Sequence, residues 1–67
     1  MILHVNGKEK TLPDQIQSVD DVLHHYSLDQ KAVIVELNEE IVERASLKEQ
    51  SIKDGDRIEI VQFVGGG

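Results

Sequence analysis

The chain has 67 residues, a length that makes one small domain and buries only about 60% of its unfolded surface, which argues against a deep active site or an internal cofactor cavity. Its net charge is −6, and its seven Lys and Arg residues form no basic stripe, which argues against nucleic-acid binding. It has no cysteine, so thiol chemistry on this chain is excluded and packing and hydrogen bonds must hold the fold together.

A β-hairpin is the first element that the sequence predicts. Leu3 and Val5 alternate with Ile2 and His4, a pattern with the period of a half-buried strand. Asn6-Gly7 follows, the preferred pair for a type I′ turn, in which both central residues have positive φ. Residues 8–12 then return as a polar strand suited to a sheet edge, and Pro13 ends it.

One helix is predicted from about Ser18 to Tyr26. The hydroxyl of Ser18 can cap a free backbone N–H near Asp21, and acidic residues suit the positive end of the helix dipole. Four side chains with spacing i, i+3, i+4 and i+7 form its apolar face: Val19, Val22, Leu23 and Tyr26.

The histidines invite a metal site, but their spacing favours solvated side chains. His24 and His25 are adjacent in the last turn, and adjacent helix residues point about 100° apart, so they cannot easily share one ion. His4 is expected to point outward from its strand. We therefore predict no metal site.

The second half of the chain predicts the rest of a sheet. Its segments are a β-branched strand at 32–37, a turn at 38–40, a short strand at 41–42, a turn at 54–56 and a last strand at 57–64. Residues 44–50 are ambiguous and could form one helical turn anchored by Leu47. We interpret one acidic cluster as a solvent-exposed edge of the sheet: Glu36, Glu39, Glu40 and Glu43.

These elements predict an α+β fold, a mixed sheet of four or five strands with one helix on one face. Seven apolar side chains are assigned to the helix side: Leu3, Val5, Leu12, Val22, Leu23, Ile58 and Ile60. Alternation then leaves Val61 and Phe63 on the open face near the C-terminus, where with Val64 they suggest a docking surface for a partner. The alternative is that segment 44–50 folds over them.

The last strand runs directly into Gly65-Gly66-Gly67. Glycine has no Cβ, so such a tail can enter a narrow channel and present the carboxylate of Gly67 to another protein. The alternative is a frayed end or an expression remnant. A carboxylate is an anion at neutral pH and a poor electrophile, so it must first be activated by a partner that binds ATP.

The hairpin, the capped helix, Asp54-Gly55-Asp56 and the ending Phe63-Val64-Gly65-Gly66-Gly67 together resemble the ubiquitin-like β-grasp sulfur carriers, and within them the thiamin-biosynthesis branch. The similarity covers essentially the whole chain. It implies a β-grasp domain over 1–64 and a glycine tail at 65–67. It also implies a carrier protein that serves partner enzymes as a co-substrate and is not itself an enzyme.

The resemblance assigns roles to the tail. Gly67 is the residue that a ubiquitin-activating-enzyme-like adenylyltransferase (ThiF type) adenylates and that becomes a thiocarboxylate, while Gly65 and Gly66 thread the partners' active sites. The sulfur then passes to thiazole synthase (ThiG type) for the thiazole ring of thiamin. ATP and a sulfur donor are used by the adenylyltransferase, and the carrier binds no cofactor.

Two other functions share the same fold signal. The small subunit of molybdopterin synthase resembles longer chains with a proline-rich approach to Gly-Gly, which this sequence lacks. A ubiquitin-like modifier would join Gly67 to a lysine of a target. No signal peptide or membrane-spanning run is recognised, and together with the absence of cysteine this leads us to expect a cytoplasmic protein without membrane partners.

Overall fold

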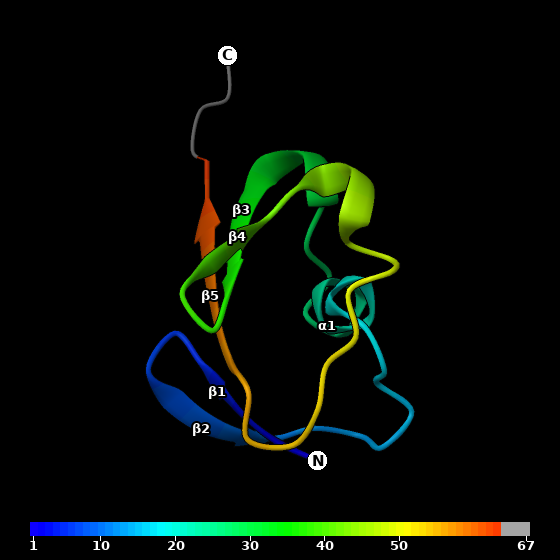
Figure 1. The fold of residues 1–67 in the computed structure, drawn as a ribbon, viewed down its shortest axis with the longest axis vertical. Helices are drawn as coiled ribbons and strands as arrows, with labels where there is room; N and C mark the ends of the chain where they lie inside the picture. Colours follow the sequence, from blue (N-terminus) through cyan, green and yellow to red (C-terminus); the bar gives the residue numbers. More distant parts are fainter. Residues whose placement is uncertain (64–67) are drawn as a thin grey trace.

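The computed structural model describes residues 1–63; positions 64–67 lie outside the described part, so the predicted boundary at residue 64 is not tested. Five strands form one mixed sheet in the order β2-β1-β5-β3-β4, with β1 and β5 parallel and the other pairs antiparallel. The strands are β1 Ile2–Val5, β2 Lys8–Thr11, β3 Val33–Leu37, β4 Glu40–Val42 and β5 Arg57–Gln62. The predicted fold class and the pairing of the first and last strands are confirmed (Figure 1).

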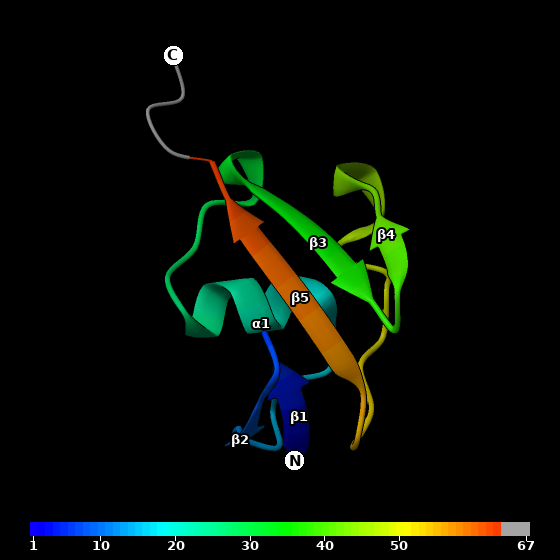
Figure 2. The same cartoon turned by 90° about the vertical axis from the view of Figure 1, so that its left-hand side faces the viewer.

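The helix α1, Val19–His25, crosses one face of this sheet (Figure 2). Its predicted cap is confirmed: the Asp21 backbone N–H donates to Ser18 Oγ at 3.1 Å, and Asp21 Oδ2 accepts from the Ser18 N–H at 3.1 Å. Asp21 Oδ2 also accepts from the Gln17 N–H at 2.9 Å, and this bond, with those to Ser18, lowers the pKa of Asp21. No helix within residues 1–63 is long and apolar enough to cross a membrane.

The helix ends in a turn that returns the chain to the sheet. The Leu28 N–H donates to the Leu23 carbonyl at 2.8 Å and the Ser27 N–H donates to the His24 carbonyl at 3.0 Å, the two bonds of a Schellman motif. Ser27 has φ 57°, a conformation that glycine usually supplies at this position. The turn places Tyr26 and Leu28 at the rim of the core.

The core lies between α1 and the sheet. All seven side chains that the sequence assigned to the helix side are buried there. The full set of buried apolar side chains is Leu3, Val5, Leu12, Ile16, Val19, Val22, Leu23, Val33, Val35, Leu37, Leu47, Ile52, Ile58 and Ile60. Ile16 was not assigned from the sequence, because it lies in a connection without a regular period.

Two short 3₁₀ turns flank β3 and β4. The turn Arg44–Ser46 confirms the helical turn predicted in segment 44–50, and Leu47 after it is buried at 2% exposure, as an anchor should be. The turn Gln30–Ala32 was not predicted; the carboxylate of Asp29 caps it by accepting from the Lys31 N–H at 2.8 Å. It takes Ala32 out of the predicted strand, so β3 begins at Val33.

Candidate functional site

The central strand β5 divides its side chains between the two faces of the sheet. Ile58 and Ile60 are buried against α1, whereas Val61 and Phe63 are 59% and 50% exposed on the face opposite the helix, which we call the open face. The prediction that Val61 and Phe63 lie there is confirmed. The alternative that segment 44–50 covers them is wrong, because Leu47 turns into the core instead.

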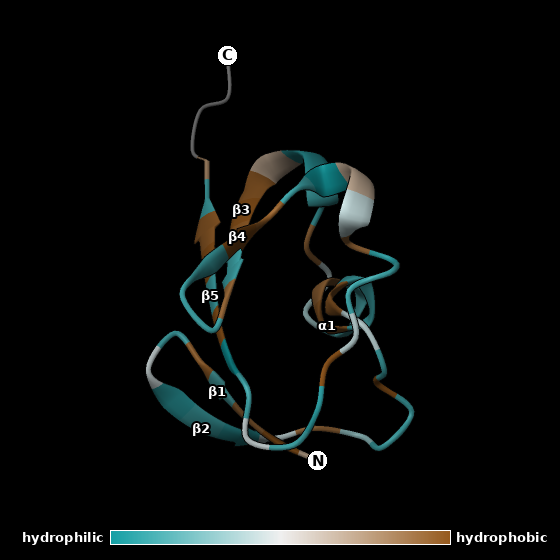
Figure 3. Cartoon of the chain, viewed as in Figure 1, coloured by the Kyte–Doolittle hydropathy of each residue, from teal (hydrophilic) through white to brown (hydrophobic). Residues whose placement is uncertain are grey.

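Two further apolar side chains join them. Ile34 on β3 pairs directly with Val61 and is 42% exposed, and Ile41 on β4 pairs with Glu36 and is 69% exposed. Alternation within β3 puts Ile34 on the face opposite the buried Val33 and Val35. The sequence period therefore indicated that Ile34 is exposed, but it did not show that Ile34 pairs with β5. Apolar segments of β3 and β5 thus lie side by side in the sheet (Figure 3). We call this set the open-face patch: Ile34, Ile41, Val61 and Phe63.

Negative charge borders the open-face patch. Glu36 and Glu59 are paired directly across β3 and β5, an arrangement of like charges that is unfavourable for the free sheet. The predicted acidic cluster is solvated as expected: Glu39, Glu40 and Glu43 are exposed and Glu36 is half-buried. No ion pair within residues 1–63 involves these acids. Their uncompensated charge would favour a partner with a basic surface.

The glycine tail is the second part of the candidate site. Gly65, Gly66 and Gly67, together with Val64 from the proposed docking surface, lie outside the described residues. The last described residue is tied to the sheet, because the Phe63 N–H donates to the Ala32 carbonyl at 2.8 Å. The open-face patch therefore adjoins the position from which the tail continues.

The buried polar groups serve the fold. Asp56 accepts hydrogen bonds from the Lys53 N–H and the Asn38 side chain, and Asp20 lies 3.4 Å from Nδ1 of His24. His24 and His25 are exposed, as predicted. Among residues 1–63, no group of three or more His, Cys, Asp or Glu side chains is arranged to hold a metal ion. The described part of the chain thus offers an exposed apolar surface and the attachment point of the tail.

The architecture is that of a β-grasp domain, a mixed five-stranded sheet with one helix across one face. The family model of the ThiS family matches residues 3–67, and the chain belongs to that family. Over 66 residues it is 42% identical to the sulfur carrier protein ThiS of Bacillus subtilis (strain 168), covering 98% of this chain and 100% of that protein.

Solved structures agree with this assignment. The crystal structure of the thiamine biosynthesis protein ThiS from Geobacter metallireducens matches with a TM-score of 0.83 and 39% identity, covering all of both chains. A solution structure of a thiamine biosynthesis protein from the same organism matches with a TM-score of 0.84 and 38% identity, covering 100% of this chain and 88% of that one.

One similar protein is much longer. The chain is 39% identical over all 67 residues to a thiazole synthase of Paramagnetospirillum magneticum (strain AMB-1), but it spans only 20% of that protein's length. In that thiazole synthase, a segment similar to this chain is therefore part of a longer polypeptide.

Proposed function

We propose that this chain is a sulfur carrier protein of thiamin biosynthesis, activated by adenylation of Gly67 and carrying sulfur as a thiocarboxylate at that residue. The observation that carries the proposal is its 42% identity to the Bacillus subtilis sulfur carrier protein over that protein's full length. The match of the family model through residue 67 supports including the glycine tail.

The proposed chemistry needs little from the carrier itself. Attack of the Gly67 carboxylate on the α-phosphorus of ATP forms an acyl-adenylate and releases pyrophosphate. Hydrosulfide from the sulfide donor then attacks the acyl carbon, and AMP leaves with the carboxylate oxygen to which it was bonded, so that one terminal oxygen is replaced by sulfur. The chain supplies a carboxylate on a slender tail, while the partner supplies ATP binding and an enclosed site that protects the intermediate from water.

Two partners follow from this proposal: an adenylyltransferase related to ubiquitin-activating enzymes, and thiazole synthase. The thiazole synthase that contains a segment similar to this chain supports the second, because joining two partners in one polypeptide raises their effective concentration. The open-face patch has the composition expected of a docking surface, because an exposed aromatic side chain lies among exposed aliphatic side chains beside the tail. The acidic residues around it favour a basic partner surface.

The test follows the mass of the C-terminal peptide. The protein is incubated with the adenylyltransferase from the same genome, ATP and a sulfide donor, and we expect pyrophosphate release followed by replacement of one oxygen by sulfur in the peptide that contains Gly67. A variant with residues added after Gly67 is the control, since its glycine carboxylate is no longer free. Equal activation of the extended and unextended proteins would contradict the proposal.

A second assay identifies the pathway. The thiocarboxylate form is offered to thiazole synthase and to the large subunit of molybdopterin synthase, and sulfur transfer only to the first is expected. Isolation of Gly67 in an isopeptide bond to lysine from cell extracts would instead support the role of a protein modifier.

A further inference from the structure

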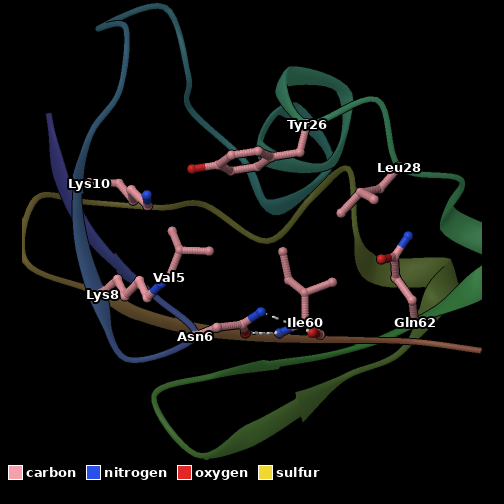
Figure 4. Close-up of a pocket in the computed structure, with 8 residues that line it drawn as sticks. All are labelled: Val5, Asn6, Lys8, Lys10, Tyr26, Leu28, Ile60 and Gln62. Carbon is pink, nitrogen blue, oxygen red and sulfur yellow. Dashed lines mark hydrogen bonds between the residues drawn. The ribbon is translucent and has the colours of Figure 1, made fainter.

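A cleft of about 420 Å³ lies on the helix side of the sheet, on the face opposite the open-face patch (Figure 4). Its floor is apolar, with Val5 from β1 and Ile60 from β5 pointing into it. Tyr26 and Leu28, placed by the turn after α1, form one wall, and Lys8 and Lys10 of β2 form the other.

The cleft carries positive charge, although the protein as a whole is acidic. Lys8 pairs with Val5 and Lys10 pairs with Leu3, so both lysines project from the edge strand on the helix side. Ion pairs within residues 1–63 form only at the amino group of Met1 and at His24, so neither lysine has a carboxylate partner there. No acid lines this cleft, whereas four other clefts of the described surface each include at least one Asp or Glu.

A free strand edge runs along the same cleft. Strand β1 pairs with β5 only as far as Val5 with Ile58, and Asn6 then takes the place of the next strand residue. Its Nδ2 donates to the Ile60 carbonyl at 3.2 Å, and its Oδ1 accepts from the Ile60 N–H at 2.7 Å, as the dashed lines in Figure 4 show.

The next backbone groups of that edge have no partner strand. Successive residues of β5 direct their hydrogen bonds alternately to β3 and to the β1 side. Because the Phe63 N–H donates to Ala32 beside β3, the N–H and C=O of Gln62 face the β1 side, where β1 no longer reaches. Within residues 1–63, Gln62 therefore presents an open donor and acceptor next to the lysines and the apolar floor.

We propose that this cleft binds an extended acidic segment of a protein partner. The backbone of such a segment adds to the free edge of β5 at Gln62. Because side chains alternate between the two faces of a sheet, every second residue of the segment faces the cleft; among these, the acidic side chains reach Lys8 and Lys10 and an aliphatic side chain contacts Tyr26 and Leu28. Charge complementarity selects this occupant: the net charge of −6 repels an acidic segment elsewhere, and two uncompensated lysines over an apolar floor attract it here. The site is independent of any chemistry at Gly67.

The experiment uses the full 67-residue protein labelled with nitrogen-15 and a defined probe, the peptide acetyl-Glu-Thr-Glu-Thr-Val-amide, whose two Glu side chains and Val side chain lie on one face when it is extended. Saturable shifts are expected at the backbone amides of Lys8, Lys10 and Gln62. The control peptide has Gln in place of both Glu residues, and it should bind at least about tenfold more weakly, since two charge-assisted contacts are lost. Equal binding of the two peptides, or no binding of either, overturns the proposal.

Hydrogen exchange tests the strand edge separately. In the free protein the Gln62 amide should exchange faster than the Phe63 amide, whose N–H is bonded to Ala32. Bound peptide should slow the exchange of Gln62. If Gln62 exchange stays unchanged while the lysine resonances shift, or if sodium pyrophosphate produces the same saturable shifts, the cleft holds small anions and the proposal is wrong.

Matched variants separate the cleft from net charge. K8Q/K10Q and K48Q/K53Q each remove two positive charges from exposed positions, but Lys48 and Lys53 do not line this cleft. The first variant should lose binding of the glutamate peptide while melting like wild type, and the second should retain it. Equal loss in both variants would mean that binding depends on overall charge and would overturn the proposal.

Discussion

Asn38 and Asp56 lock two turns together at one end of the sheet. Nδ2 of Asn38 donates to Oδ1 of Asp56 at 3.1 Å, and Oδ1 of Asn38 accepts from the Arg57 N–H at 3.0 Å. The other carboxylate oxygen of Asp56 accepts from the Lys53 N–H at 2.9 Å, and the Asp56 side chain is only 6% exposed. One buried carboxylate thus ties the turn before β5 to the turn between β3 and β4.

This contact predicts that Asp56→Ala destabilises the fold. The change leaves the Lys53 N–H and the Asn38 amide without their acceptor, which costs about 1–3 kcal/mol in the free energy of unfolding. Urea denaturation measures it. Glu49→Ala removes the same charge from an exposed side chain and should change stability little; an equal loss in both variants would mean that the Asp56 contact adds nothing.

Glu39 predicts a stabilising substitution. It has φ 72° in the turn between β3 and β4, the position that Gly7 occupies with φ 81° in the first hairpin. Because a side chain with Cβ is strained in this left-handed region, Glu39→Gly should raise the free energy of unfolding by about 0.5–1 kcal/mol. Gly7→Ala should lower it by a similar amount. Destabilisation by Glu39→Gly in urea melts would show that backbone strain is not the dominant effect at this turn.

The capping box predicts a pH dependence. Hydrogen bonds from the backbone N–H groups of Gln17 and Ser18, with that to the Ser18 side chain, lower the pKa of Asp21, the Gln17 bond being the largest cause. A carboxyl whose pKa is lowered by folding contributes stability that is present above its unfolded value of about 3.9 and is lost as pH falls through its folded value. The stability difference between wild type and Asp21→Asn should therefore shrink below about pH 4.

Ser18→Ala is the control for this pH series. Its loss of about 1 kcal/mol comes mainly from the uncharged hydrogen bond between the Asp21 N–H and Ser18 Oγ and should largely persist at low pH, because the Ser18 side chain is only a lesser cause of the lowered pKa of Asp21. Thermal melts of the three proteins between about pH 2 and pH 6 check this. A constant difference between wild type and Asp21→Asn over that range would contradict the role assigned to the ionised carboxylate.

Phe63→Ala tests the open-face patch. Phe63 is 50% exposed, so the variant should melt close to wild type, yet it should weaken association with the adenylyltransferase by about 2 kcal/mol or more if the patch is the docking surface. Isothermal titration calorimetry measures the association. Leu47→Ala gives the opposite pattern expected of a core residue, with about 2–5 kcal/mol lost from folding. A large drop in melting for Phe63→Ala would place Phe63 in the core.

The pair Glu36 and Glu59 predicts a conflict between stability and binding. Glu59→Lys replaces two like charges across β3 and β5 with an opposite pair and should add about 0.2–1 kcal/mol to stability. The same change should slow association with a basic partner and weaken the dependence of that association on salt. Unchanged association rates at low salt would show that these acids do not contribute to docking.

The sequence by itself determined the local structure. Asn6-Gly7 specified the first turn, and Ser18 and Asp21 specified the start of α1. The alternation along β5 correctly assigned Ile58 and Ile60 to the buried face of the strand and Val61 to the exposed face. These features depend on backbone preferences and side-chain periods within a few residues, which a sequence shows directly. The resemblance in the motifs also identified the family before any strand pairing was known.

Only the tertiary structure decided which distant residues meet. The joining of Ile34 and Ile41 to Val61, the bond of Asn38 with Asp56 and the cleft between Lys8, Lys10 and Tyr26 all depend on strand order and register. Those are properties of pairing between segments far apart in the chain, and no local period encodes them. The positive φ of Glu39 has the same origin, because packing of β3 and β4 imposes a turn that the residue itself does not prefer.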